Sequence, residues 1–393
     1  MTMTTIVEQL EAALPLMIAD VETLVTCESP SADLRAVSAS ASVVARIGAA
    51  RLGTEAELIV ADGRTHLRWR LGTGPPRVLV LGHHDTVWPI GTLAAHPFTI
   101  TNGILRGPGC FDMKAGLVMA FHAVDALAER SGITILITGD EEVGSPTSRT
   151  LIESEAAGCV AVLVLEAAAD GGALKIERKG VSLYQVAVHG RAAHAGLEPE
   201  LGVNATIELA HQILAVSALA DADSGTTVTP TVLSAGTTSN TVPAAGSLSI
   251  DVRVSEVAEQ QRVHAAMLAL PPVLPGARVE VCGGPNRPPL ERAASAILFA
   301  RAGELAADLG LPPLTGASVG GASDGNFTAG VGTPTLDGLG AIGGGAHGAD
   351  EHVLVGELPG RAALLAVLLH DLLADAGKSQ ITNLGYRSGG NRP

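Results

Sequence analysis

Apolar residues follow two patterns along the chain, and each pattern predicts a different kind of element. Short segments that are apolar at consecutive positions, and hence on both faces, are typical of the central parallel strands of an α/β sheet. Apolar residues that recur every three or four positions predict amphipathic helices. We therefore predict an α/β domain with a mixed, mainly parallel sheet flanked by helices. The predicted strands of this domain cover 56–60, 66–70, 78–81, 133–137 and 160–165, and its helices cover 5–26, 32–52, 112–130, 291–309 and 358–376.

The middle of the chain has a different pattern. Its predicted elements follow in the order βαββαβ, which is the ferredoxin-like arrangement and leaves one face of the sheet without helices. Such a self-contained unit is typical of an inserted domain, and its free face or edge suits association. We expect an inserted ferredoxin-like α+β dimerisation domain over 178–286, a main domain formed by 1–177 and 287–380, and a flexible polar tail over 381–393. The strands of the insert are predicted at 181–188, 227–234, 248–254 and 278–282, and its helices at 203–219 and 256–269.

Composition and charge exclude several classes of partner. The 393 residues carry a formal net charge of -15, whereas nucleic acids and anionic membranes require clustered Lys and Arg. The four cysteines form no CxxC pair, so neither a disulfide framework nor a structural zinc knuckle is predicted. No apolar run is long enough to span a membrane, and the N-terminal segment carries acids where a signal peptide carries bases. We therefore expect a cytoplasmic protein with no nucleic-acid or membrane partner.

Ionisable residues follow each of the three predicted strands that are apolar on both faces, at 78–81, 133–137 and 160–165. His83 and Asp85 come after the first run, Glu141 and Glu142 after the second, and Glu166 after the third. Because the carboxyl ends of parallel strands meet at one edge of a sheet, we expect these side chains to gather there. Adjacent glutamates ionise together at such an edge only at a high cost unless a cation compensates them. A solvated acidic turn is the alternative explanation of the two glutamates.

Two further residues extend this group. Asp112 begins a predicted helix, where it could equally be an N-cap, and His347 lies in a glycine-rich loop, where it could be an ordinary polar surface residue. Together with the residues at the strand ends they supply two imidazoles and several carboxylates. This is the ligand set of a site for two divalent ions. The absence of a thiolate favours Zn, with Co or Mn as alternatives.

Five motifs make the sequence resemble the M20 metallopeptidases, which include glutamate carboxypeptidases, aminoacylases, dipeptidases and desuccinylases. They occur in the family's order, and the resemblance covers about residues 5–376. It implies a di-zinc exopeptidase-like catalytic domain, an inserted dimerisation domain and a homodimer. The motifs are HHDTV at 83, GPGCFDMKAG at 107, TGDEEVGS at 138, LEAA at 165 and GGAHGADE at 343.

The resemblance also implies a ligand set for two zinc ions per subunit. His83 and Glu166 would bind one ion, and Glu142 and His347 would bind the other. Asp112 would bridge the pair, which offsets the repulsion between two close cations.

Two acids next to these ligands would act on the reaction itself. By the same resemblance, Asp85 would orient His83 through the second ring nitrogen of that histidine. Glu141 would be the general base that takes a proton from a metal-bridging water and passes it to the leaving amine. The hydroxide formed in this way would attack an amide carbonyl polarised by one zinc.

Residues of the inserted domain and of a later loop are implied to contact the substrate. His194 matches a family histidine that reaches the partner subunit's active site and helps to hold the oxyanion, although a lone surface histidine would also explain it. Asn240 and Arg253 match positions that contact the substrate's carboxylate end, and arginine suits a bidentate clamp. A cross-strand ion pair is the alternative for Arg253. Gly320 and Gly321 are expected to line the substrate pocket.

One position departs from the glutamate-cleaving members of the family. They carry an arginine a few residues before the GG-x-[ST]-D segment, where this chain has Ser318, and a serine cannot pair with a carboxylate side chain as an arginine does. A neutral or aromatic C-terminal residue is therefore at least as consistent with the sequence as glutamate. Ser323, within that segment, is also expected at the pocket.

We therefore predict a di-zinc hydrolase that cleaves the amide bond of an N-acyl-amino acid or short peptide beside a free C-terminal carboxylate. A deacylase acting on a non-peptide amide is an alternative within the family. A catalytically silent binding protein is an alternative of another class, and the intact Glu141 and five intact ligands disfavour it. An NAD-binding Rossmann protein is disfavoured because the glycines at 107 and 109 do not form a GxGxxG motif after the first strand.

Overall fold

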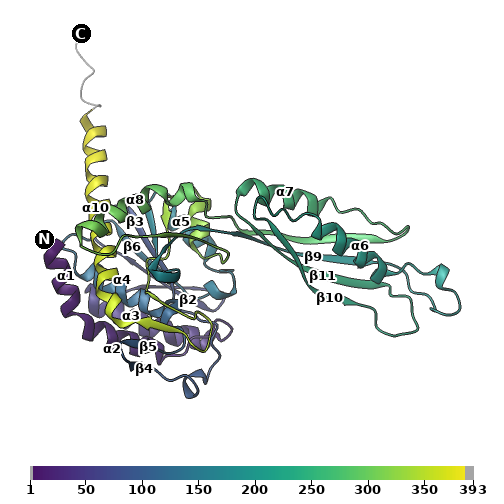
Figure 1. Cartoon of the computed structure of the whole chain (residues 1–393), viewed down its shortest axis with the longest axis horizontal. Helices are drawn as coiled ribbons and strands as arrows, with labels where there is room; N and C mark the ends of the chain where they lie inside the picture. The colour runs from purple at the N-terminus through teal and green to yellow at the C-terminus, as the bar shows by residue number, and fades with distance from the viewer. Residues whose placement is uncertain (1–2, 386–393) are drawn as a thin grey trace, which may run out of the picture. The chain divides into compact units, whose positions relative to one another are not determined.

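The structure is a computed structural model in which residues 3–385 are described. The chain forms two compact units (Figure 1). The first comprises Met1–Ile176, Arg292–Ser318 and Ser323–Pro393, and the second comprises Glu177–Glu291 and Val319–Ala322. The second unit is thus built mainly from one continuous stretch in the middle of the sequence. No helix in the described part of the chain has both the length and the apolar content needed to cross a membrane.

The first unit contains a six-stranded sheet in the order β1-β2-β6-β3-β7-β14. The pairs among β6, β3, β7 and β14 are parallel, whereas β1 and β2 form an antiparallel hairpin that extends the sheet beyond β6. This confirms the predicted mixed, mainly parallel sheet. The strands are β1 (Glu57–Ala61), β2 (Arg64–Arg70), β3 (Val78–His83), β6 (Ile133–Thr138), β7 (Ala161–Val164) and β14 (Thr335–Leu336).

Helices cover both faces of this sheet, which is why its central strands are apolar at every position. On β3, Val78 and Val80 belong to the large core formed with α3, α4, α8 and α10. Leu79 and Leu81 point to the other face, where they meet a smaller core formed with α5 and α9. The helices are α1 (Met3–Ala12), α2 (Leu14–Val25), α3 (Leu34–Leu52), α4 (Ala115–Asp125), α5 (Arg149–Ala156), α8 (Arg292–Asp308), α9 (Gly325–Gly330) and α10 (Leu358–Gly385).

Three helix boundaries differ from the prediction. The helix predicted over 5–26 is two helices, because Pro15 in the first turn of α2 lacks the N–H that a continuous helix would need. The helix after Asp112 begins at Ala115 and ends at Asp125, so Asp112 is not its N-cap. The closing helix α10 continues to Gly385, past the predicted end at Ala376. The predicted flexible tail therefore begins inside this helix, and 386–393 lie outside the described residues.

The second unit is a four-stranded antiparallel sheet in the order β10-β11-β9-β12. In Figure 1, α6 and α7 lie on the same face of this sheet, and buried residues of both helices share one core with alternate residues of the strands. The order βαββαβ is the predicted one. The elements are β9 (Gly180–His189), α6 (Ala205–Ser217), β10 (Thr227–Ala235), β11 (Ala245–Val254), α7 (Val257–Leu268) and β12 (Arg278–Arg287).

Several short strands between the longer elements form two small sheets. A small sheet in the order β15-β16-β5-β4 includes Gly343 and Gly344, shortly before His347. β8 and β13 pair with each other as a two-stranded sheet. These strands are β4 (Thr99–Thr101), β5 (Ile104–Arg106), β8 (Leu174–Arg178), β13 (Gly316–Val319), β15 (Gly343–Gly344) and β16 (His352–Leu354).

The packing of α3 on the sheet gives a test of the core. A Cβ atom on Gly48 would overlap the indole of Trp69, whose ring packs edge-on against Phe121. We expect Gly48→Ala to lower the free energy of unfolding, because overpacking of about 1–3 kcal/mol exceeds the helix-propensity gain of about 0.5–1 kcal/mol. Urea unfolding measures the change.

The matched control is Gly303→Ala in α8, where nothing lies within 4 Å of the added Cβ. This variant should gain about 0.5–1 kcal/mol from helix propensity alone. Equal changes in the two variants would contradict the close packing of α3 against Trp69.

Candidate metal centre

Three neighbouring parallel strands deliver ionisable side chains to one edge of the sheet. His83 is the last residue of β3, Glu141 and Glu142 begin a short 3-10 turn after β6, and Glu166 lies two positions after the end of β7. The chain needs a glycine just before the turn. A Cβ on Gly139 would lie 2.7 Å from the carbonyl oxygen of Thr65 and 2.9 Å from the imidazole of the residue after His83. The predicted gathering of these residues is therefore present.

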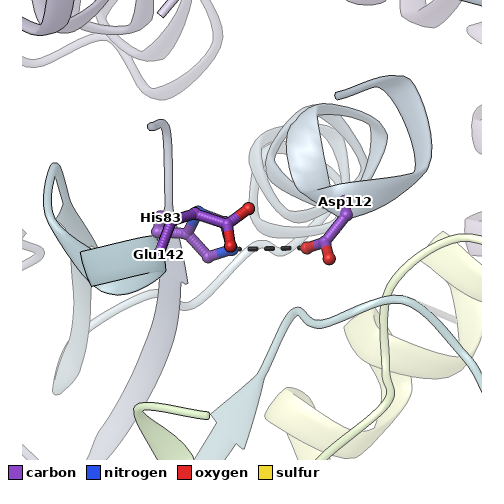
Figure 2. Close-up of side chains that lie close together, drawn as sticks. All are labelled: His83, Asp112 and Glu142. Atoms are coloured by element: carbon purple, nitrogen blue, oxygen red, sulfur yellow. Dashed lines mark ion pairs between the residues drawn. The ribbon is translucent and has the colours of Figure 1, made fainter. Parts of the chain in front are cut away.

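Asp112 and His347 join this edge from elsewhere in the chain. Figure 2 shows the Asp112 carboxylate pointing to the imidazole of His83, with Glu142 beside that imidazole. His83 Nε2 lies 3.4 Å from Asp112 Oδ1 and 3.6 Å from Glu166 Oε1. His347 Nε2 lies 3.3 Å from Asp112 Oδ2 and 3.3 Å from Glu142 Oε1. The two oxygens of Asp112 thus face different histidines, and a different glutamate completes each group.

These separations fit ligands that share an ion. Four ligand atoms at 2.0–2.2 Å from a tetrahedral ion are about 3.3–3.6 Å from one another. Asp112 Oδ1 and Glu142 Oε1 are buried and have no hydrogen-bond partner among the described residues, which is costly for carboxylate oxygens unless a cation meets them. One ligand atom each of His83, Glu141 and Glu166 also lie within 4.8 Å of one another, so Glu141 borders the same group. The residues present therefore fit divalent ions.

The electrostatics of the cluster show the same demand for positive charge. Burial alone would lower the pKa of His83, but the carboxylates of Asp112, Asp85 and Glu166 raise it well above its usual value. The carboxylate of Asp112, and then that of Glu142, raise the pKa of His347 to about 10. The backbone of His347 has a φ of 63°, a conformation that is rare for residues other than glycine. Protons or metal ions would neutralise the negative charge of these carboxylates, and metal ions compete with protons for the same imidazole lone pairs.

The contacts between Asp85 and His83 differ in detail from the predicted ones. The ring nitrogen Nδ1 of His83 donates to the main-chain carbonyl of Asp85 at 2.9 Å, and the Asp85 carboxylate lies 3.4 Å away. Because a carbonyl only accepts, Nδ1 carries the proton and Nε2 is left to face the cluster. The carboxylate itself accepts from the amides of Glu141 and Glu142, each at 3.2 Å, and from the Ser31 hydroxyl at 2.6 Å. Asp85 thus ties the end of β3 to the turn after β6.

A second group of buried polar residues binds the main chain on either side of the turn after β6. The Asp140 carboxylate accepts from the amide and hydroxyl of both Thr147 and Ser148. His66 Nδ1 accepts from the Gly139 amide at 3.2 Å, so its Nε2 donates to the Thr147 hydroxyl at 3.0 Å. The sequence patterns did not single out these residues or Ser31, because each is an ordinary polar residue whose partner is distant in sequence.

Ser318 and Ser323, which the sequence predicted at the substrate pocket, do not belong to this cluster of imidazoles and carboxylates. Ser318 is exposed on β13. Ser323, which was expected at the substrate pocket, is fully buried, and its hydroxyl donates to Asp337 at 2.7 Å. An unpredicted cation lies closer to the cluster, since Lys175 Nζ is 3.7 Å from Glu166 Oε2.

The remaining predicted residues belong to the second unit. His194 is exposed, and its Nδ1 accepts from the amides of Gly196 and Leu197, each at 3.1 Å. In the neutral ring Nε2 therefore carries the proton and is a hydrogen-bond donor. Arg253 forms a bidentate ion pair with Asp251 of the same strand, at 2.8 and 2.9 Å, rather than a cross-strand pair. The others in this unit are Asn240, which is exposed, Gly320 and Gly321.

A cluster of imidazoles and carboxylates at the carboxyl edge of an α/β sheet is the arrangement of a metal-dependent enzyme. Residues 79–371 match the sequence profile of peptidase family M20/M25/M40. The chain belongs to this family and is a metal-dependent hydrolase.

Two relatives and one solved structure are similar over most of their lengths. Carboxypeptidase G2 of a Pseudomonas species is 33% identical over 326 residues, which cover 78% of this chain and 76% of that protein. Succinyl-diaminopimelate desuccinylase of Halorhodospira halophila is 29% identical over 360 residues, covering 85% and 93%. The aminopeptidase PepT of Bacillus cereus shares the fold, with a TM-score of 0.70 at 22% identity over 93% of this chain and 99% of that one.

The hydrogen bonds of His66 predict how stability changes with pH. Burial lowers the pKa of His66 below its usual value near 6.5, and Nδ1 is already engaged as an acceptor. As pH falls below about 6.5, the unfolded chain binds a proton at this residue that the folded chain excludes, so folding stability falls. In His66→Gln this contribution is absent, and the free energy of unfolding should fall less steeply between about pH 7 and pH 5. Urea titrations at several pH values measure both slopes, and parallel slopes would contradict the neutral, buried imidazole.

Proposed function

We propose that this chain is a di-zinc hydrolase that cleaves the amide bond of an N-acyl-amino acid or short peptide beside a free C-terminal carboxylate. One observation carries most of the support. The two oxygens of Asp112 face the imidazoles of His83 and His347, at 3.4 and 3.3 Å. A carboxylate shared in this way suits a pair of ions, and the mixed nitrogen and oxygen donors suit Zn, with Co or Mn able to replace it.

The proposed ligands divide into two groups around Asp112. His83 and Glu166 would hold one ion, and Glu142 and His347 would hold the other. When bound, such ions polarise the carbonyl of the substrate and make a water molecule acidic near neutral pH. The main-chain carbonyl of Asp85 keeps His83 in the tautomer that a metal ligand requires.

Glu141 is the proposed general base. Its carboxylate accepts a proton from the attacking water while the water oxygen bonds to the amide carbon, and it then gives that proton to the nitrogen as the carbon–nitrogen bond breaks. The products are a carboxylic acid and an amine. The Glu141 amide donates to Asp85, which fixes the main chain beneath this acid.

His194 is proposed to stabilise the oxyanion that forms on the carbonyl oxygen. Two amides donate to its Nδ1, which leaves Nε2–H as the donor that such a role needs. The family resemblance implies that this histidine acts in the active site of the partner subunit, so we propose a homodimer. Arg253 and Asn240 remain proposed contacts of the substrate carboxylate, and Arg253 would bind it while paired to Asp251.

A substrate that ends in a neutral or aromatic residue is proposed as at least as suitable as one that ends in glutamate. Ser318 is exposed on β13 and brings no charge to the position where glutamate-cleaving members carry arginine. The names of the two relatives include a carboxypeptidase and a desuccinylase. Deacylation of a non-peptide amide is therefore the second candidate.

A substrate panel tests the proposed reaction. The metal-free protein is reconstituted with Zn²⁺ or Co²⁺ and offered acetyl-, benzoyl- and succinyl-amino acids, dipeptides and acylated amines without a carboxylate. Release of free amine is measured. We expect turnover only of substrates that have a free carboxylate beside the amide, whereas preferential cleavage of the acylated amines would favour the second candidate. Binding without amine release from any substrate would contradict a hydrolase.

The role of Glu141 has a sharper test. In Glu141→Gln, which has almost the same size but cannot take a proton, kcat should fall by about 10²–10⁴-fold while two metal ions remain bound. Elemental analysis and initial rates measure the two properties. Glu153→Gln is the control, because Glu153 lies on α5 and pairs with Arg149 at 2.8 Å, and it should change neither. Loss of both ions in Glu141→Gln would instead make Glu141 a ligand.

Position 318 tests the proposed specificity. Ser318→Arg should raise kcat/KM for N-acyl-glutamate relative to N-acyl-leucine by about tenfold to 100-fold, since a charge-assisted hydrogen bond contributes about 1.5–3 kcal/mol. Ser318→Gln adds a polar side chain without charge and serves as the control. An unchanged ratio in the arginine variant would remove position 318 from the specificity pocket.

A further inference from the structure

Glu351 is a buried acid for which the proposed reaction has no use. It is 3% exposed and lies four positions after His347, just before β16. Its Oε1 accepts from the amides of Phe111 and Asp112, at 2.9 and 3.0 Å. Its Oε2 accepts from the Gly109 amide at 2.9 Å and from the indole N–H of Trp88 at 2.7 Å. Each oxygen of this carboxylate thus accepts two hydrogen bonds.

These four donors come from the segments that carry proposed ligands. Three of them are main-chain amides of the loop that ends in Asp112. The fourth, Trp88, lies on the segment that leaves β3 after His83. Glu351 itself shares the loop of His347. One carboxylate therefore joins three segments, and two of them are more than 200 residues apart in sequence, since the Glu351 and Asp112 positions differ by 239.

The side chain of Asp112 has little else to fix it. In the part of the chain that the structure describes, no group donates a hydrogen bond to its buried Oδ1, and its two oxygens face the imidazoles of His83 and His347. Its backbone, with a φ of -114° and a ψ of 94°, is not helical, and neither is that of the next residue, Met113. The direction of this carboxylate therefore depends on how its main chain is held.

We infer that Glu351 is a positioning residue that sets Asp112 between the two metal positions by binding the amides of Gly109, Phe111 and Asp112. This inference rests on the proposed metal-dependent function. Four donors require an acceptor with two oxygens and no N–H of its own, which a carboxylate provides. A glutamine would present an NH₂ group to two of these donors, although its size is nearly the same.

If Glu351 positions Asp112, its replacement should weaken metal binding. Metal-free Glu351→Gln is titrated with Zn²⁺ and with Co²⁺ by calorimetry, and binding should be weaker than in the wild type by about 10–100-fold, the usual effect of removing a group that orients a ligand. Trp88→Phe, which removes one of four donors and keeps an aromatic ring, should weaken binding in the same direction by a smaller factor. This milder variant keeps the test decisive where Glu351→Gln folds poorly.

Glu155→Gln is the matched control. Glu155 is also a buried acid, and its Oε1 accepts from Arg68 and Arg70, each at 2.6 Å, on the far end of β2 from the metal ligands. This variant should lose folding stability without a change in metal affinity. Glu351→Asp, which keeps the two oxygens on a shorter side chain, should recover part of the affinity that Glu351→Gln loses.

The outcomes separate this inference from the proposed function. If wild-type protein binds no divalent ions, the proposed metal centre is wrong. If wild-type protein binds them and both Glu351→Gln and Trp88→Phe bind them equally tightly, the metal centre stands and the positioning role is overturned. Weaker binding in Glu155→Gln to the same extent would also overturn it, because the loss would then reflect general destabilisation.

Discussion

Mutual repulsion among carboxylates is the constraint on which this structure depends. Asp112, Glu142 and Glu166 converge with Glu141 on two imidazoles within a few ångströms at one edge of the sheet. Acids at such separations raise one another's pKa unless positive charge intervenes. The fold must therefore hold these side chains against their repulsion even before any ion binds. Main-chain hydrogen bonds around the cluster provide that resistance.

The acids that hold the cluster in place are not the proposed metal ligands. They accept hydrogen bonds from the main chain of the loops that carry those ligands. Asp85 binds the amides of the turn after β6, and Asp140 binds the start of α5 from beneath the same turn. Glu351 does the same for the loop of Asp112. In each case a buried carboxylate accepts at least two N–H bonds, which stabilise its charge. The site thus has an outer group of acids that hold the main chain and an inner group that faces the imidazoles.

Most of the fold and the inner group could be predicted from the sequence. Strands such as Val78–His83 are apolar on both faces, and the residues that follow them must meet at one edge. The outer group could not be predicted in the same way, because Glu351 and Asp112 are 239 positions apart and no local pattern records their contact. The split of the first helix was missed because its apolar spacing continues through Pro15, whereas the main chain does not. Local periodicity reports burial, but long-range hydrogen bonds follow only from the fold.

The position of Trp88 makes this chain convenient for optical study. The sequence contains two tryptophans, of which Trp69 is fully enclosed in the core and Trp88 is half-buried with its indole on Glu351. Indole emission depends on the polarity around the ring and on the partner of its N–H group. The difference between the spectra of wild-type protein and a variant without Trp88 therefore isolates a signal from beside the Asp112 loop. The protein carries its own fluorescent reporter of events at the ion-binding edge, and no label has to be attached.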